Sequence, residues 1–150
     1  MRVVRVAGES MAPTYRSCDV LLTRGVGTAG MPRRGEVVVF RHGGTRMLKR
    51  VVGVPDDRVE LEAGHLFVNG ASVDGRVRAP GAYTAVWDVP GGSYFVAGDN
   101  PGVSDDSRVW DEPFVPVDNV EAVVIRRLAG GRRRTGLRPR GLPGAADPGA

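Results

Sequence analysis

Cysteine and histidine, which most often form disulfides or hold metals, are scarce in this 150-residue chain, which has one cysteine and two histidines. Cys18 alone cannot form an internal disulfide, and with only His42 and His65 beside it a metal site has too few ligands of these types. The sequence therefore predicts a protein that needs neither a metal nor any other cofactor.

Long apolar runs are also missing. The longest are pieces such as residues 37–40, far short of the ~18 consecutive apolar residues that a membrane span needs. Near the N-terminus, Arg2, Arg5 and Glu9 interrupt the apolar residues, so no apolar core of a secretory signal peptide is present. We expect no transmembrane segment in this chain, and a cytoplasmic or peripherally membrane-associated protein.

Lysine is as scarce as cysteine, because 20 of the 21 basic residues are arginine and only Lys49 is lysine. A guanidinium stays charged, so Lys49 is the one side-chain amine that could lose its proton near neutral pH. An arginine-rich composition could equally have left one lysine by chance. The surroundings of Lys49 must decide between these interpretations.

The positive charge is confined to one end of the chain. Residues 1–128 hold 16 basic and 16 acidic residues, so the net charge of +4 comes from residues 129–150, with five arginines and one aspartate. This Gly/Pro/Arg-rich tail lacks apolar periodicity and is predicted to be disordered. It could contact an anionic membrane or an acidic partner. Without a basic face or a recognition helix on the neutral body, we expect no nucleic-acid binding; the oligomeric state stays open.

The 22 glycines and 11 prolines favour short strands joined by turns. Residues 36–40 are nearly all apolar, as in a strand buried on both faces, whereas the hairpin of residues 58–70 alternates as on a half-exposed sheet. We predict one mostly β domain with little helix over residues 1–128. The expected strands are residues 3–6, 20–22, 36–40, 47–54, 58–62, 65–70, 83–87, 94–97 and 120–128.

A possible Ser/Lys pair stands out within this pattern. Ser10 lies in a turn that Gly8 and Pro13 enforce, and Lys49 lies in an apolar strand, with Arg50 on the opposite face. A serine hydroxyl needs a base to become a good nucleophile, and a lysine can be that base if burial lowers its pKa. A serine beside glycine more often caps a turn, so the pair alone does not establish catalysis.

Four segments, taken in order, resemble the motifs of the type I signal peptidases, serine proteases that use Ser and Lys in place of a Ser/His/Asp triad. This resemblance implies a signal-peptidase-like β-sheet or barrel fold for residues 1–128. It also implies a serine endopeptidase that removes an N-terminal signal or leader peptide from a precursor. The segments are a nucleophile motif at residues 8–14, a buried-strand motif at 34–40, a base motif at 48–55 and a loop motif at 98–108.

The resemblance assigns roles by position. Ser10 would be the nucleophile and Lys49 the general base, with Ser104 orienting the Lys49 amine through a hydroxyl hydrogen bond. The Ser10 backbone N–H would be one oxyanion donor. Some family members add a hydroxyl two residues before the nucleophile, but Gly8 stands there, which leaves the second donor unidentified.

The loop motif has supporting roles in the same resemblance. Asp106 and Arg108 would form an ion pair that fixes the loop, although without the resemblance they would be an ordinary surface pair. Ser104, without the resemblance, would be a serine that caps the loop. Asp99 and Asn100 are expected to shape the turn through their own backbone hydrogen bonds.

The substrate, a precursor protein or peptide, would bind as an extended strand with small residues one and three positions before the cut. Met11, Met47 and Leu48 flank the pair and would line these shallow pockets, or would be plain core residues. Three positions depart from the family pattern. Cys18 and Asp56 stand where a glycine is usual, with backbone strain expected at Cys18 more than at Asp56, and residues 101–102 replace a charged pair.

With only nine residues before Ser10, the chain resembles small anchor-free members thought to trim the leader of nickel-type superoxide dismutase. Two alternatives stay open. One is a LexA-type self-cleaving domain, which would need a DNA-binding segment before Ser10. The other is a catalytically silent peptide-binding module on the same fold, which would have little reason to keep Ser10, Lys49 and Ser104 together.

Overall fold

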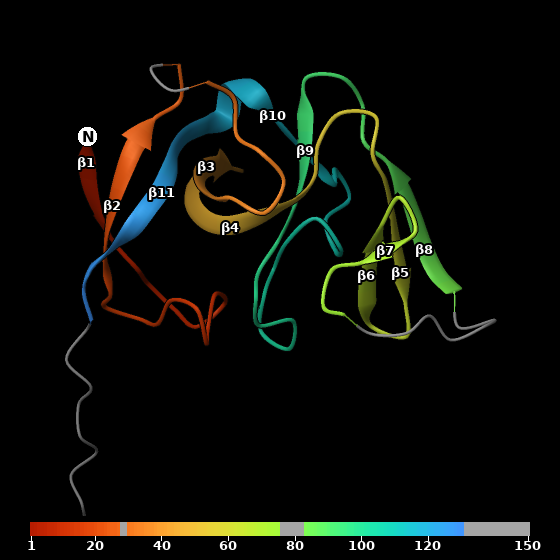
Figure 1. The fold of residues 1–150 in the computed structure, drawn as a ribbon, viewed down its shortest axis with the longest axis horizontal. Coiled ribbons are helices and arrows are strands. Elements are labelled where there is room, and N and C mark those ends of the chain that lie inside the picture. The colour runs from red at the N-terminus through yellow and green to blue at the C-terminus, as the bar shows by residue number, and fades with distance from the viewer. Residues whose placement is uncertain (28–29, 76–82, 131–150) are drawn as a thin grey trace, which may run out of the picture.

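The computed structural model describes residues 1–27, 30–75 and 83–130, in which eleven strands form two antiparallel sheets (Figure 1). The larger sheet has the order β1-β2-β11-β3-β4-β9-β10 and the smaller one the order β7-β6-β5-β8. The larger sheet consists of β1 (Arg2–Arg5), β2 (Val20–Gly25), β3 (Val37–His42), β4 (Thr45–Gly53), β9 (Ser93–Ala97), β10 (Phe114–Pro116) and β11 (Val120–Ala129). The smaller sheet consists of β5 (Arg58–Glu62), β6 (His65–Val68), β7 (Ala71–Ser72) and β8 (Tyr83–Asp88).

The prediction of a mostly β fold with little helix is confirmed. Each of the nine expected strands appears, with ends shifted by a few residues, and the last strand ends at Ala129. The prediction missed β7 and β10, which are short, and the 3-10 helix η1 (Val117–Asn119). The expectation of disorder concerns residues 129–150, of which 131–150 lie outside the described part. Across the described ranges, the structure holds no helix long and apolar enough to cross a membrane.

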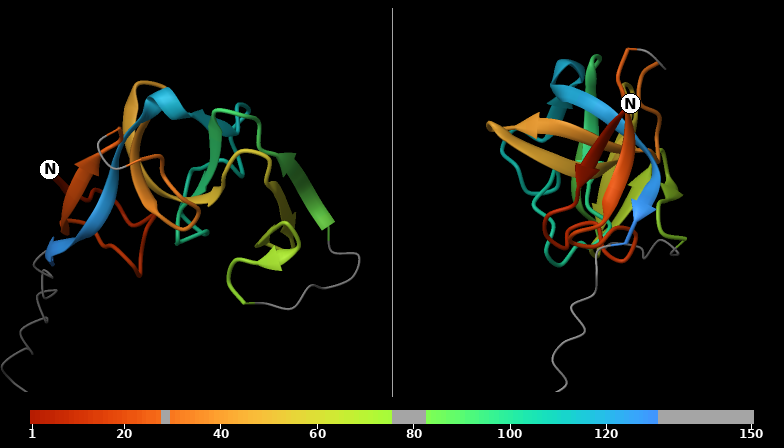
Figure 2. Two further views of the ribbon diagram at one scale, coloured as in Figure 1. Left: turned by 45° about the horizontal axis from the view of Figure 1, so that its top comes forward. Right: turned by 90° about the vertical axis from the view of Figure 1, so that its left-hand side faces the viewer.

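The larger sheet curls around its own apolar face (Figure 2). Residues 37–40 of β3 are all buried, as their apolar run predicts. Val38 and Phe40 pack with Val51 of β4 and Val96 of β9 in one core cluster. This core fixes the position of β4, the strand that carries Lys49.

A second cluster joins the two sheets. Val52 of β4 and Phe95 of β9 pack against Val59 of β5. The strands approach so closely that a Cβ on Gly53 would lie 2.8 Å from a Val59 methyl carbon, a contact that real side chains do not make. The expected half-exposed hairpin is wrong for β5, because Val59 is buried against the larger sheet and Glu60, on the opposite face of the strand, is buried as well.

Two loops meet at one end of the larger sheet. The nucleophile loop, residues 6–19, connects β1 to β2, and the catalytic loop, residues 98–113, connects β9 to β10. Both lie at the lower edge of the molecule as drawn in Figure 1. The fold therefore brings together two motifs that are about ninety residues apart in sequence.

Candidate active site

Main-chain hydrogen bonds close the nucleophile loop at its base. The Val6 N–H donates to the Asp19 carbonyl at 2.8 Å, and the Cys18 N–H donates to the Val6 carbonyl at 2.8 Å. Higher in the loop, the Tyr15 N–H donates to the Met11 carbonyl at 3.0 Å. These bonds hold Ser10 at the tip of a closed loop rather than on a free segment.

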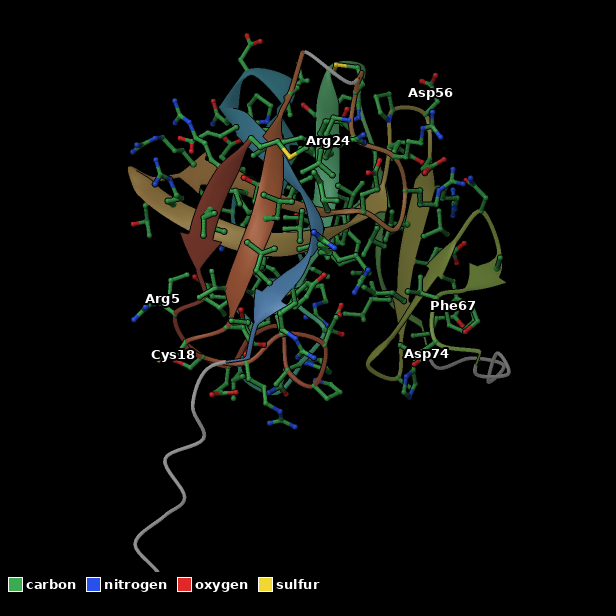
Figure 3. All side chains as sticks on the ribbon, turned by 60° about the vertical axis from the view of Figure 1, so that its left-hand side comes forward. Arg5, Cys18, Arg24, Asp56, Phe67 and Asp74 are labelled. Carbon is green, nitrogen blue, oxygen red and sulfur yellow. The ribbon has the colours of Figure 1, made fainter. Side chains whose placement is uncertain are left out.

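Cys18 has φ 71°, in the left-handed region, as its place in a glycine-type turn predicts, and Asp56 has φ 72°. The Cys18 side chain is exposed at the lower end of the molecule (Figure 3). A cysteine in a turn that enters a strand fits a small buried hydrophobe from the sequence alone, and this expectation is wrong because the side chain is exposed. The turn that leads into β2 points this side chain outward, away from the core beneath the loop.

Lys49 lies on β4 opposite Val38 of β3, so its side chain points to the core side of the sheet. It is 5% exposed. Burial lowers the pKa of the Lys49 amine, although the charges of Asp106 and Asp105 act in the opposite direction. A buried amine with a lowered pKa is the state that a general base requires.

Ser10 and Lys49 line the same groove, whose volume is about 380 Å³. Met11, Met47 and Leu48 line it as well. Met11 is also 1% exposed and Met47 packs against the core cluster, so these methionines serve the core and the groove together. The sequence left a substrate pocket and the core as alternative places for these residues, and in the fold the two methionines belong to both.

The Ser10 hydroxyl and the Lys49 amine share this groove without forming a hydrogen bond to each other. Ser104 is also close to Ser10, and its hydroxyl donates to Asp106 Oδ2 at 2.6 Å rather than forming a hydrogen bond with the Lys49 amine. Catalytic hydrogen bonds are often long or poorly aligned until a substrate is bound. The Ser10 N–H donates to no group in the described part of the chain, which leaves it available to an incoming oxyanion.

Asp106 organises the catalytic loop from a fully buried position. Its carboxylate accepts hydrogen bonds from the Gly98 N–H at 2.8 Å, from Ser104, and from Arg108 Nη2 at 2.6 Å. Burial alone would raise the pKa of Asp106, but these hydrogen bonds outweigh it and hold the pKa below its ordinary value. The structure thus contains the Asp106–Arg108 ion pair, with Asp106 buried rather than at the surface.

Asn100 shapes the turn through its main-chain carbonyl, which accepts hydrogen bonds from the N–H groups of Val103 at 3.2 Å and Ser104 at 3.1 Å. The side chains of Asp99 and Asn100 bridge to other segments instead of bonding to their own turn. The Asp99 carboxylate accepts hydrogen bonds from Arg50 of β4 at 2.9 and 2.6 Å and from the Thr14 hydroxyl at 2.6 Å. The Asn100 side-chain amide donates to the Glu9 carbonyl at 3.0 Å. Sequence reasoning missed Arg50 and Thr14, although the position of Arg50 next to Lys49 was a usable signal.

Gly98 is a further residue that the sequence did not single out for its own role. A Cβ at this position would collide with the Ser104 hydroxyl and would lie 2.5 Å from the Ser10 carbonyl oxygen. The Asn100 N–H donates to that same carbonyl at 2.9 Å. Glycine is required here because the loop that contains Gly98 passes directly against Ser10.

With this geometry in place, comparison with known proteins identifies the family. The family model described as "Signal peptidase, peptidase S26" matches residues 1–128. The chain belongs to this family. Signal peptidase I of Pseudomonas fluorescens is 33% identical over 135 residues, and the match covers 67% of this chain and 48% of that protein. A probable signal peptidase I-2 of Synechocystis is 34% identical over 122 residues, covering 74% of this chain and 55% of that protein.

The chain thus spans about half the length of these curated relatives. Among solved structures, a signal peptidase I from Enterococcus faecalis is 32% identical with a TM-score of 0.49, and the match covers 63% of this chain and 97% of that one. Family membership is carried by the model match over residues 1–128.

Proposed function

We propose that this protein is a serine endopeptidase that removes an N-terminal signal or leader peptide from a precursor protein. Ser10 is the nucleophile and Lys49 is the general base. The observation that carries the proposal is the groove that both residues line, in which the only lysine of the chain is 5% exposed and burial lowers its pKa. The names of the relatives favour the same activity.

In the first step, the neutral Lys49 amine takes the proton of the Ser10 hydroxyl while Oγ attacks the scissile carbonyl carbon. The oxyanion that forms accepts a hydrogen bond from the Ser10 N–H. The protonated Lys49 then gives its proton to the leaving amine as the peptide bond breaks, which leaves an acyl group on Ser10. A water molecule, deprotonated by Lys49, hydrolyses this ester and restores the hydroxyl.

Ser104 is a positioning residue in this proposal. Its hydroxyl proton is directed to Asp106, so its oxygen lone pairs remain as acceptors for the Lys49 ammonium. Ser104→Ala should therefore lower the rate in part, and the remaining activity should still require Lys49.

The groove favours an extended substrate. In the described part of the fold, β1 is an edge strand of the larger sheet, and residues 45–49 of β4 pair with β3 on one side only, because β9 pairs with β4 from Arg50 onward. Residues 4–7 and 45–49 both line the groove. A peptide lying between them can add as a strand, with main-chain hydrogen bonds for affinity and small side chains in the shallow pockets.

The deciding experiment is cleavage of a peptide with alanine one and three positions before the cut, followed by mass spectrometry. Ser10→Ala and Lys49→Arg should both be inactive, because a guanidinium cannot accept the proton. Cys18→Ser, a change of an exposed side chain in the same loop, should keep most of the activity and serves as the control. Cleavage by Lys49→Arg near the wild-type rate would contradict the assigned base, and tight peptide binding without cleavage would indicate a silent binding module.

The resemblance narrows this proposal further, to the leader of a nickel-type superoxide dismutase precursor. This finer assignment stays a prediction. It is tested by incubating the purified protein with such a precursor and with a secretory precursor, and by sequencing the new N-termini. Preferred processing of the secretory precursor would contradict the finer assignment and leave the protease activity in place.

A further inference from the structure

A second pocket, of about 670 Å³, lies at the opposite end of the larger sheet from the catalytic loop. Strand β9 connects the two ends, because Tyr94 at its start lines the pocket and Gly98, just after its end, contacts Ser10. Four residues of strand separate Tyr94 from Gly98 by about 13 Å. In Figure 1, the start of β9 is at the upper edge and the catalytic loop is at the lower edge. The pocket is therefore separate from the peptide groove.

The walls of this pocket are mainly apolar. Met31, Val54, Pro55 and Val117 contribute to them from the loop before β3, the loop after β4 and the helix η1. Val54 and Val117 also pack against the core cluster that contains Tyr94, so this side of the pocket is a fixed part of the fold. The volume lies in the range of about 300–1,000 Å³ that is typical of small-ligand sites.

Tyr94 provides an unusual polar group in these walls. The residue is 3% exposed, yet its hydroxyl has no hydrogen-bond partner in the described part of the chain. The hydroxyl itself is not fully buried, so it is open to the pocket and can donate a hydrogen bond to an acceptor placed there. Burial raises the pKa of the Tyr94 phenol and the charge of Glu36 adds to this effect, so the hydroxyl stays protonated and can donate.

The charges around the pocket leave one positive group in excess. Arg34 binds Asp57 at 2.7 Å, and the Glu36 carboxylate accepts the Arg33 main-chain N–H at 2.8 Å and contacts Arg24 at 3.4 Å. The Arg33 guanidinium lines the same pocket and has no partner among the described residues. A phenol donor and an unpaired guanidinium beside apolar walls suit a ligand that carries an anionic group on an apolar chain.

We propose that this pocket binds a carboxylate at the end of an apolar chain. The carboxylate accepts hydrogen bonds from the Tyr94 hydroxyl and the Arg33 guanidinium, and the chain lies against Met31, Val54 and Val117. A fatty acid and the C-terminus of an apolar peptide share this chemistry. The site is distinct from the one that cleaves peptides, and the proposal does not depend on the protease activity.

Octanoate and 1-octanol are the first pair of probes, and a short peptide ending in leucine, as the free acid and as the amide, is the second. Binding to the full chain is measured by titration with detection of the main-chain NMR signals of Val54, Gly92 and Val117. We expect the acid of at least one pair to bind about tenfold more tightly than its neutral partner. The pair with the tighter acid identifies the natural source of the carboxylate.

Two variants test the assigned contacts. Tyr94→Phe keeps the ring and removes the hydroxyl, and it should weaken binding of the acid about tenfold while leaving binding of the neutral probe unchanged. Arg33→Ala should weaken the acid similarly, whereas Arg2→Ala, which removes an exposed arginine on β1, is the matched control. Ser10→Ala should bind the acid like the wild type. The proposal is overturned if neither acid is preferred over its neutral partner, or if Tyr94→Phe binds the acid as tightly as the wild type.

Discussion

Lys49 faces three charges that set how readily its amine loses a proton. Burial lowers its pKa from the ordinary value of 10.5, Asp106 and Asp105 raise it in part, and Arg108 lowers it. Because only the neutral amine accepts the Ser10 proton, the cleavage rate should rise with pH through this lowered pKa. Changing one of these neighbouring charges should therefore shift the rising part of the pH profile without altering Ser10 or Lys49.

Asp105→Asn tests this balance. Removing a negative charge that favours the ammonium form should lower the Lys49 pKa further and move the rising part of the kcat/KM profile to lower pH. The shift should be larger at low salt, because Asp105 is exposed and its charge is screened. Asp111→Asn, an exposed change farther along the same loop, should leave the profile in place. A shift to higher pH would contradict the assignment of Lys49 as the base.

Gly98 sets the spacing between the two serines. In Gly98→Ala the new methyl group would meet the Ser104 hydroxyl and the Ser10 carbonyl, so the nucleophile must move. A displacement of about 1 Å can reduce a rate about a hundredfold, and we expect a fall in kcat of that order. Gly102→Ala is the control in the same loop, because a Cβ there has no heavy atom within 4 Å and its backbone is not left-handed. Equal kcat values for both variants would show that the contact at Gly98 has no effect on catalysis.

Among the elements, β4 carries Lys49, the proposed base, on one face and Arg50, which anchors the strand to two loops, on the other. Arg50, next to Lys49, binds the Asp99 carboxylate with two hydrogen bonds and the Gly35 carbonyl with a third at 2.7 Å. Thr14 donates to the same carboxylate. This single carboxylate therefore joins β4, the catalytic loop and the nucleophile loop.

Asp99→Asn should destabilise the fold by about 1.5–3 kcal/mol, the usual range for hydrogen bonds to a charged group. Burial raises the pKa of Asp99, but hydrogen bonds from Arg50 and Thr14 outweigh it, so the folded pKa lies below the ordinary 3.8. Its stabilisation is therefore present above about pH 4 and is lost as pH falls through the folded pKa.

Urea denaturation between pH 2 and pH 7 measures this dependence, which should be weaker in Asp99→Asn than in the wild type. Glu121→Gln, which weakens the more exposed contacts with Arg41 and Arg46, is the control and should cost at most about 1 kcal/mol. If the two variants lose the same stability, Asp99 is an ordinary surface partner.

The strands could be predicted from local patterns because each one alternates or is apolar within a few residues, as at residues 37–40. Lys49 could be singled out for a related reason, as a lone amine in an apolar strand. The contacts of Asp99 and the need for glycine at Gly98 could not be predicted, since they depend on where the nucleophile loop lies about ninety residues earlier in the chain. The burial of Glu60 could not be predicted either, because the alternation of β5 places its side chain on the face opposite Val59, away from the core cluster.

At the scale of the whole molecule, the larger sheet curls without closing. The order β1-β2-β11-β3-β4-β9-β10 leaves β1 at one edge, and residues 45–49 of β4 lack a strand on one side in the described part of the fold. Two unpaired strand segments thus face the groove that holds Ser10 and Lys49. Such edges are templates for an added strand.

A substrate that completes the sheet should depend on its main-chain amides as well as its side chains. Methylating one amide nitrogen that faces an edge removes a donor and adds bulk, so KM for that peptide should rise about tenfold, in line with a lost hydrogen bond of about 1 kcal/mol plus a steric cost. The next amide nitrogen of an extended chain points to the other side of the peptide. Methylating it should therefore change KM by a different amount. A scan of single N-methyl peptides should show its largest KM increases within three or four residues before the cut, with little effect farther away. A uniform response along the peptide would mean that the substrate is held by its side chains, and that the open edges of β1 and β4 take no part in binding.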